Sequence, residues 1–228
     1  MKLVARYDYR EGVKIPKSGP AIVVSNHVSY LDAFALAFFL YSHGRTPRFL
    51  GKSQVFRVPI IGKILLAAEQ IPVERESKEA RVALQYALRL LEMGHLVGVY
   101  PEGTLTRDKE YWPMIAKTGA ARLAVIAQVP VYPAAQWGTQ QVIPPYRKKL
   151  RIFPRATVRY RVGEPVDLSR WYGKEEDPAA MVEATAEIMR AITALLEEIR
   201  GQQRPAAIFD PHTSDLPRTG NFRKGEKK

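Results

Sequence analysis

The chain has 228 residues, 46% of them hydrophobic, and a formal net charge of +12 at neutral pH. A chain of this length can bury one sizeable core, and its charge indicates an acidic partner: a phosphate-bearing ligand, an anionic membrane or nucleic acid. Because it contains no cysteine, a disulfide framework, a thiolate metal site and an acyl-cysteine intermediate are excluded.

The first strong pattern is an apolar run at residues 21–25, typical of a buried strand, followed by an apolar helix over residues 31–41. The linking sequence NHVSYLD places His27 in the turn and Asp32 in the first helical turn. A carboxylate that fixes one imidazole nitrogen leaves the other free as a general base for a hydroxyl group. Alternatively, Ser29 and Asp32 form a capping box, and Asp32 only stabilises the start of the helix.

Further along the chain, apolar strands alternate with helical patterns, which predicts a single α/β domain. We expect strands at residues 48–51, 71–73, 96–100, around 131 and at 157–162. We expect helices from residue 59, and over residues 77–93, 119–128 and 178–200. The last helix begins with Asp177 as N-cap and Pro178 at its first position, and Gly201 closes it. The domain is predicted over residues 1–201, followed by a polar tail at 202–228 that is disordered or wraps the surface.

Four blocks resemble the 1-acylglycerol-3-phosphate acyltransferase family and occur in its order. They are Asn-His-x4-Asp at residues 26–32, IPVER at 71–75, YPEGTLT at 100–106 and VPVYP at 129–133. The resemblance covers about residues 10–165 and implies a glycerol-3-phosphate acyltransferase-like fold, a mixed, mostly parallel sheet flanked by helices. The sequence departs from the family at Leu105, where the third block usually has arginine, although Arg107 follows two residues later. Tyr100 replaces a phenylalanine, a change that we expect to be harmless.

The resemblance implies that His27 and Asp32 are catalytic and that the third block binds the substrate phosphate together with Arg75. A glycine allows backbone N–H groups to approach an anion closely, and a guanidinium pairs bidentately with phosphate oxygens. Because a carboxylate is a poor phosphate ligand, we expect Glu102 to hold an arginine or the glycerol hydroxyl. The residues expected around the substrate phosphate are Arg75, Glu102, Gly103, Thr104, Arg107 and Lys52. A surface position is equally compatible with Lys52.

The function implied by the resemblance is transfer of a fatty acyl group from acyl-CoA or acyl-carrier protein to the free hydroxyl of lysophosphatidic acid, giving phosphatidic acid. Two alternatives remain. In the first, the chain is an acyltransferase whose acceptor is glycerol 3-phosphate or another lysophospholipid. In the second, the chain is a non-catalytic basic module that binds anionic membranes or nucleic acid. Because charge alone would not produce four ordered blocks, we expect an enzyme and no nucleic-acid partner. One histidine with two carboxylates is thin support for a metal site, so we expect neither metal nor cofactor.

Membrane contact is expected because both acceptor and product are lipids. No stretch approaches the ~20 apolar residues that span a bilayer, so we expect a peripheral protein at the cytoplasmic face of the cell membrane. The candidates for contact with the anionic surface are the basic loop at residues 147–151 and the exposed members of the aromatic set Tyr111, Trp112 and Trp137. The alternatives are a solvated surface for the loop and core packing for the aromatic residues.

Overall fold

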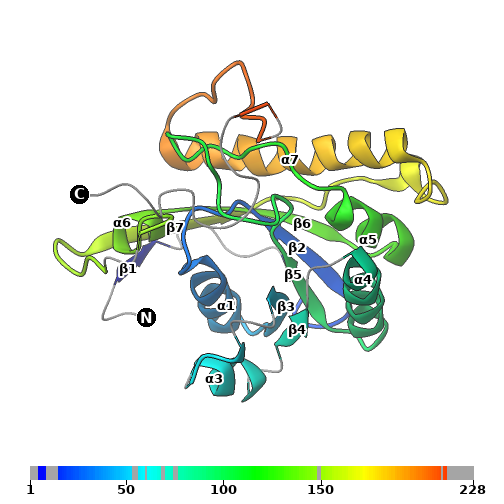
Figure 1. Cartoon of the computed structure of the whole chain (residues 1–228), viewed down its shortest axis with the longest axis horizontal. Coiled ribbons are helices and arrows are strands. Elements are labelled where there is room, and N and C mark those ends of the chain that lie inside the picture. The colour runs from blue at the N-terminus through cyan, green and yellow to red at the C-terminus, as the bar shows by residue number, and fades with distance from the viewer. Residues whose placement is uncertain are drawn as a thin grey trace.

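A computed structural model describes residues 5–8, 15–52, 56–59, 61–67, 70–73, 77–147, 150–211 and 213–214. Over these residues the chain forms a seven-stranded sheet in the order β1-β7-β6-β2-β5-β3-β4, with helices on both faces (Figure 1). The strands are β1 (Ala5–Asp8), β2 (Ala21–Ser25), β3 (Pro47–Lys52), β4 (Ile71–Val73), β5 (Leu96–Val99), β6 (Val131–Trp137) and β7 (Ala156–Val162). The helices are α1 (Asp32–Ser42), α3 (Ile61–Ala67), α4 (Ser77–Glu92), α5 (Gly119–Ala127), α6 (Thr139–Val142), α7 (Pro178–Arg200) and the 3-10 helix η1 (Ser169–Trp171).

Most neighbouring strands run parallel. The pair β6–β7 is antiparallel, whereas β1–β7, β6–β2, β2–β5, β5–β3 and β3–β4 are parallel. This arrangement confirms the predicted α/β fold with a mixed, mostly parallel sheet. The sequence patterns did not predict β1, α6 or η1.

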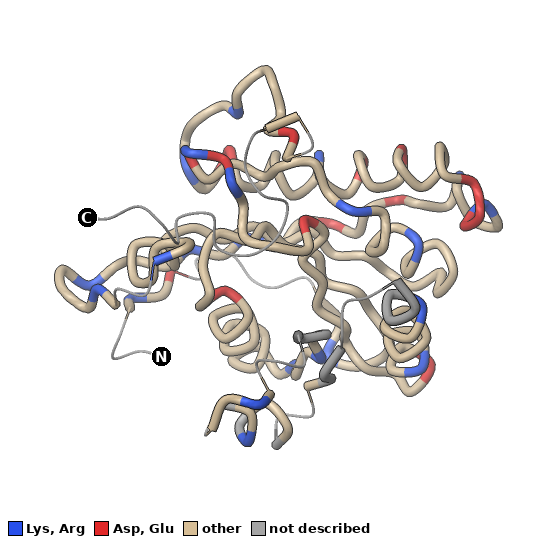
Figure 2. Tube along the Cα trace, viewed as in Figure 1, with Lys and Arg blue, Asp and Glu red and all other residues tan. Residues whose placement is uncertain are grey.

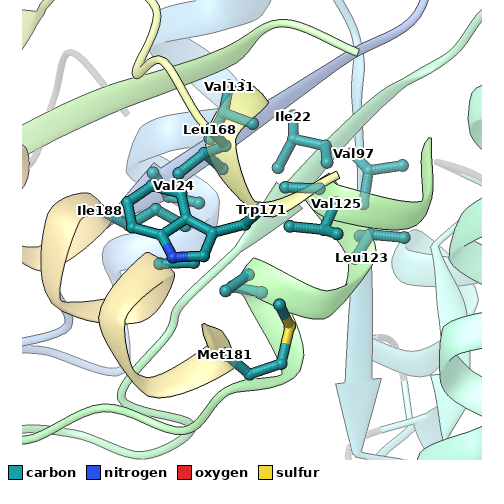
Figure 3. Close-up of a cluster of buried hydrophobic side chains, with 14 of the residues drawn as sticks. Ile22, Val24, Val97, Leu123, Val125, Val131, Leu168, Trp171, Met181 and Ile188 are labelled. Carbon is teal, nitrogen blue, oxygen red and sulfur yellow. The ribbon is translucent and has the colours of Figure 1, made fainter. Parts of the chain in front are cut away.

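The side chains of β2 alternate between the two faces of the sheet, as they must in a strand. Ile22 and Val24 belong to the core cluster shared with α4, α5 and α7, whereas Ala21 and Val23 belong to the cluster under α1. Figure 3 shows the first cluster, in which the indole of Trp171 lies among aliphatic side chains from the sheet and the helices. Because β2 is buried on both faces, the turn that follows it starts from a rigid position.

Helix α7 begins and ends at the predicted residues. The Asp177 carboxylate accepts hydrogen bonds from the N–H groups of Ala179 and Ala180 at 2.9 and 3.3 Å, and Pro178 is the first helical residue. Gly201 ends the helix with a positive φ of 61°, a conformation that suits glycine. The helix lies across one face of the sheet, against β6 and β7 (Figure 1).

The arginine at the end of α7 packs against two tryptophans. The guanidinium carbon of Arg200 lies 3.9 Å from the ring centroid of Trp112 and 4.3 Å from that of Trp137, and Tyr111 contacts Trp137 edge-on. Trp112 is 4% exposed. Trp112 is therefore part of the core, which is the alternative given for it above, and its ring is covered by Arg200, so it is not among the exposed aromatic residues expected at a membrane surface.

Part of the predicted C-terminal tail packs on the domain. The N–H group of Ile115 donates to the carbonyl of Phe209 at 3.0 Å, and the N–H group of Arg204 donates to the Glu197 carboxylate at 2.8 Å. Residues 215–228 lie outside the described residues, so the predicted domain boundary stays a prediction. Within the described parts of the chain, no helix has the length and apolar character needed to cross a bilayer.

Three loops meet at one edge of the sheet. Strands β2, β5 and β6 are parallel neighbours, so the segments that follow Ser25, Val99 and Trp137 emerge together at their carboxyl ends. In open α/β sheets this edge is where ligands usually bind. The loops carry the NHVSYLD turn, the YPEGTLT block and the start of α6.

Candidate active site

The turn between β2 and α1 brings His27 and Asp32 together. His27 Nδ1 lies 2.9 Å from Asp32 Oδ2, with the histidine side chain 20% exposed and the aspartate side chain fully buried. Because a carboxylate accepts this hydrogen bond, Nδ1 carries the hydrogen and Nε2 keeps its lone pair. None of the described residues forms a hydrogen bond with Nε2. The pair has the geometry of a general base with its orienting carboxylate.

Asp32 is held by further donors. Its Oδ2 accepts from the backbone N–H groups of Val28 at 2.6 Å and Ser29 at 2.8 Å, and its Oδ1 accepts from Thr139 Oγ1 at 2.5 Å. These bonds compensate the loss of water around a fully buried carboxylate. They also lock its orientation toward His27.

The contacts of Asp32 include those of a capping box and go beyond them. The assigned N-cap of α1 is Leu31, which has no side-chain cap bond, but the Asp32 carboxylate turns back to the N–H groups of Val28 and Ser29, which precede the helix. Ser29 Oγ donates to the carbonyl of Ile143 at 2.7 Å and accepts from the N–H group of Leu31 at 3.1 Å. Ser29 therefore ties the turn to the segment after α6, and Asp32 serves His27.

Tyr100 supports the imidazole from one side. Its ring stacks on that of His27, with centroids 4.3 Å apart and planes 22° apart, and Phe49 stacks on the other side of Tyr100 with centroids 5.9 Å apart. Burial, and secondarily the charge of Asp32, raise the pKa of Tyr100 well above its usual value. Tyr100 therefore stays neutral and orients the ring by contact. Sequence reasoning treated this position only as a harmless replacement and missed its packing role.

Glu102 braces the backbone of the site. It is 2% exposed, and its two carboxyl oxygens accept from the N–H groups of His27 and Met114, both at 3.1 Å. The carbonyl of His27 accepts from the N–H group of Thr106 at 2.7 Å, so the third block grips both backbone polar groups of His27. Glu102 was expected to hold an arginine or the glycerol hydroxyl; among the described residues, its oxygens bind backbone N–H groups.

The environment of Glu102 favours its protonated form. Burial raises the pKa of Glu102 to about 8, and the two backbone hydrogen bonds offset only part of this effect. The nearby charges of Asp32 and Asp108 raise this pKa further. A carboxyl group that titrates near neutral pH suits a structural brace better than an anion that holds an arginine.

The structure describes the side chains of only some of the basic residues expected around a substrate phosphate. Arg107 is 3% exposed, with its guanidinium carbon 5.5 Å from the ring centroid of Tyr146. Leu105, at the position of the missing motif arginine, is buried. Arg75 lies outside the described residues, and for Lys52 only the backbone is described, at the end of β3.

Gly103 and Thr104 are half-buried residues of the third block. Gly103 has a φ of +68°, and a side chain built on it would meet Lys117 Cδ at 3.2 Å and Nζ at 3.5 Å. The hydroxyl of Thr104 hydrogen-bonds to Tyr146. Lys117 therefore brings a positive charge beside the turn. Sequence reasoning missed it because its distance from the block along the chain gives no sign of this contact.

Asn26 connects the turn to β6. Its side-chain amide donates to the carbonyl of Gln136 at 3.0 Å and accepts from the N–H group of Gln136 at 2.9 Å. These two bonds continue the pairing of β2 with β6 for one step beyond the strand. Because Asn26 precedes His27 directly, the clamp fixes where the imidazole leaves the sheet. Among the described residues, no group of three His, Cys, Asp or Glu side chains has the spacing of a metal site.

Comparisons with known proteins find similar sequences and a similar fold. Residues 6–137 match the family model described as Acyltransferase. A 1-acyl-sn-glycerol-3-phosphate acyltransferase of Bacillus subtilis is 27% identical over 83% of this chain and 92% of its own length. The chloroplastic enzyme BAT2 of Brassica napus is 30% identical over 69% of this chain and 42% of its length.

The chloroplastic enzyme LPAT1 of Arabidopsis thaliana is 34% identical over 59% of this chain. The chain spans only 42% and 37% of the length of the two plant relatives. The crystal structure of the 1-acyl-sn-glycerophosphate acyltransferase PlsC from Thermotoga maritima superposes with a TM-score of 0.68 at 23% identity. The superposition covers 89% of this chain and 76% of the PlsC chain, and it shows that the two proteins share a fold.

Proposed function

Because the chain belongs to the acyltransferase family, we propose that it transfers a fatty acyl group from a thioester donor to the free hydroxyl of lysophosphatidic acid, giving phosphatidic acid. The observation that carries the proposal is the 2.9 Å contact between His27 Nδ1 and Asp32 Oδ2, which leaves Nε2 available to a substrate. The names of the Bacillus and plant relatives support the acceptor.

In the proposed reaction, His27 Nε2 removes the proton of the acceptor hydroxyl as its oxygen attacks the thioester carbonyl. Asp32 stabilises the imidazolium that forms. The tetrahedral intermediate then collapses, the C–S bond breaks, and the imidazolium returns its proton to the leaving thiolate. The ester and the free thiol are the products, and the enzyme is unchanged. No acyl-enzyme forms on sulfur, because the chain has no cysteine.

The acceptor phosphate is proposed to bind beside the third block. Gly103 in this turn has a positive φ and donates its N–H group to the carbonyl of Tyr100 at 2.9 Å, and Lys117 lies next to it. Arg107 follows in the same loop. Arg75 and Lys52 are proposed as further ligands from the resemblance. Cationic side chains and exposed N–H groups are what a phosphate monoester requires. Neither a metal nor a cofactor is needed for this chemistry, and acyl-CoA or acyl-carrier protein serves as co-substrate.

The reaction is further proposed to take place at the cytoplasmic face of the membrane, where soluble thioester donors meet lipid. The α6–β7 loop has exposed apolar side chains, with Leu150 52%, Ile152 40% and Phe153 84% exposed. Arg147 and Arg151 of the same loop are exposed as well. Figure 2 shows basic segments on this loop at one end of the molecule, whereas acidic segments recur along α7. Such a mixture of apolar and cationic residues favours an anionic interface.

The test is product analysis with purified protein. Lysophosphatidic acid, glycerol 3-phosphate and lysophosphatidylcholine are each offered with acyl-CoA and with acyl-carrier-protein thioesters of several chain lengths. Since the protein has no cysteine, a thiol reagent reports only thiol released from the donor. We expect phosphatidic acid from lysophosphatidic acid. If only another acceptor is esterified, the acceptor assigned to the enzyme must be changed. If no combination of donor and acceptor releases thiol, the proposal is overturned.

A further inference from the structure

We propose that Thr139 is a positioning residue for the catalytic pair, with Gln136 behind it in a relay that runs Gln136–Thr139–Asp32–His27. This inference rests on the proposed function. Thr139 lies 107 residues from Asp32 in the sequence and reaches the site because α6 follows β6 directly. No sequence block includes it, and its hydroxyl does not need to touch substrate to act.

The geometry singles out Asp32 Oδ1. Oδ2 receives three donors, namely His27 Nδ1 and the N–H groups of Val28 and Ser29. Oδ1 receives the Thr139 hydroxyl at 2.5 Å, and both residues are fully buried. In the described part of the chain, no other donor reaches Oδ1. Thr139 therefore completes the set of donors that holds the plane of the carboxylate in its orientation toward His27.

The hydroxyl hydrogen of Thr139 goes to Asp32. Thr139 Oγ1 also lies 2.9 Å from Gln136 Oε1, but a hydroxyl has one hydrogen, and the shorter bond to a carboxylate is the stronger one. With the amide turned so that its NH2 group faces Thr139, Gln136 donates to Oγ1 and the relay is complete. This orientation also gives a partner to the Gln136 amide nitrogen, which otherwise has none among the described residues.

The backbone of Gln136 is held by the turn that carries His27. Its backbone N–H and C=O groups are both bound by Asn26, the residue before His27. The relay therefore begins at a residue of β6 whose backbone is paired with Asn26, and it ends at His27, the residue after Asn26. Loss of the Thr139 hydroxyl should disturb the orientation of the imidazole, which the chemical step requires, and leave the binding of both substrates nearly unchanged.

The test compares Thr139→Val, which keeps the shape and removes the hydroxyl, with Thr139→Ser, which keeps the hydroxyl. The matched control is Thr185→Val in α7, where a buried hydroxyl donates to the Met181 carbonyl far along the chain from the site. We expect Thr139→Val to lower kcat by about 10- to 100-fold with KM within about threefold, a loss typical of an oriented, charge-assisted bond. Thr139→Ser should stay within about threefold of wild type, as should Thr185→Val.

A second readout does not depend on turnover. Long-range ¹H–¹⁵N NMR of the histidine rings gives the tautomer of His27, with His27→Ala assigning its signals. We expect the hydrogen on Nδ1 in the wild type, a changed Nδ1 resonance in Thr139→Val, and a wild-type resonance in Thr139→Ser. This measurement separates the two proposals: if the wild type transfers no acyl group, the proposed function fails, while the resonances still decide the role of Thr139. A Thr139→Val protein with wild-type kcat, or with an unchanged His27 resonance and only the stability loss of Thr185→Val, would overturn the inference.

Discussion

At the scale of single residues, Asp32 determines the orientation of the His27 ring, because its contact with Nδ1 leaves Nε2 to face a substrate. Its carboxylate accepts from His27, from two backbone N–H groups and from Thr139. An amide in its place would direct an NH2 group at some of these donors. We therefore expect Asp32→Asn to lower kcat by about 10²-fold or more. Thiol release and thermal unfolding of the same sample measure both effects; a folded variant with normal turnover would show that Asp32 has only a structural role.

Glu102 predicts a pH dependence of stability. Burial raises its pKa from 4.5 to about 8 in the folded protein, so between these values the folded state holds a proton that the unfolded state has released. The stabilisation is complete below about pH 4.5, and the free energy of unfolding falls as the pH rises through about 8. The slope reaches at most about 1.4 kcal/mol per pH unit.

In Glu102→Gln, the free energy of unfolding should lack the pH-dependent contribution of the Glu102 carboxyl group. Urea denaturation of wild type and variant at pH 6, 7, 8 and 9 measures the difference. The variant should be the less stable protein at pH 6, because it loses one backbone hydrogen bond. The difference in free energy of unfolding between wild type and variant should become smaller toward pH 9. Parallel curves for the two proteins would mean that Glu102 titrates outside this range.

The sequence allowed His27 and Asp32 to be predicted because they lie only five positions apart in one turn. Residues that reach the site from other elements were missed, since their contacts depend on sheet topology. Thr139 contacts Asp32 across 107 residues, and Asn26 binds Gln136 across 110. The backbone contacts of Glu102 were missed for a similar reason: that Met114 supplies one of its partners is not visible from the block itself.

At the scale of elements, long helices with clear end signals were predicted well and short segments were not. The bounds of α7 follow from an apolar stripe, an N-cap and a closing glycine. By contrast, β1 is four residues long and pairs with β7 about 150 positions later, and α6 has four residues. Such short segments have too little periodicity of their own, because tertiary contacts stabilise them.

The α7 cap gives a stability prediction that leaves chemistry untouched. Asp177→Ala removes the acceptor for the N–H groups of Ala179 and Ala180 and should lower the free energy of unfolding by about 1 kcal/mol. Asp177→Ser, which restores an acceptor, is the matched control. Turnover per folded molecule should stay at the wild-type value in both, as urea denaturation and thiol release will show. A loss of kcat in Asp177→Ala would mean that α7 is coupled to the site.

At the scale of the whole molecule, the net charge of +12 predicts salt-sensitive attraction to anionic lipid. Each basic residue near such a surface contributes about 1 kcal/mol. Neutralising Arg147 and Arg151 in the exposed loop should therefore weaken binding to anionic vesicles by about 10- to 30-fold at low salt. The control removes the same charge elsewhere, with Arg170→Gln and Arg190→Gln on η1 and α7, where both side chains are exposed.

Co-sedimentation with neutral and anionic vesicles at low and high salt distinguishes the possible outcomes. We expect strong binding to anionic vesicles at low salt, a marked loss at high salt, and a larger effect of the loop variant than of the control. Equal binding to both vesicle types would assign the attachment to the apolar side chains of the loop. Equal losses in the two double variants would mean that net charge, and not the loop, directs the protein to the membrane.

The central claim is that His27 is the general base of an acyl transfer to lysophosphatidic acid. It is tested most directly by thiol release from acyl-CoA with lysophosphatidic acid in wild type and His27→Ala, each checked by circular dichroism and thermal unfolding. We predict that the variant keeps the fold and loses about 10²- to 10⁴-fold or more of the rate. A folded His27→Ala protein with near-normal turnover would contradict the account.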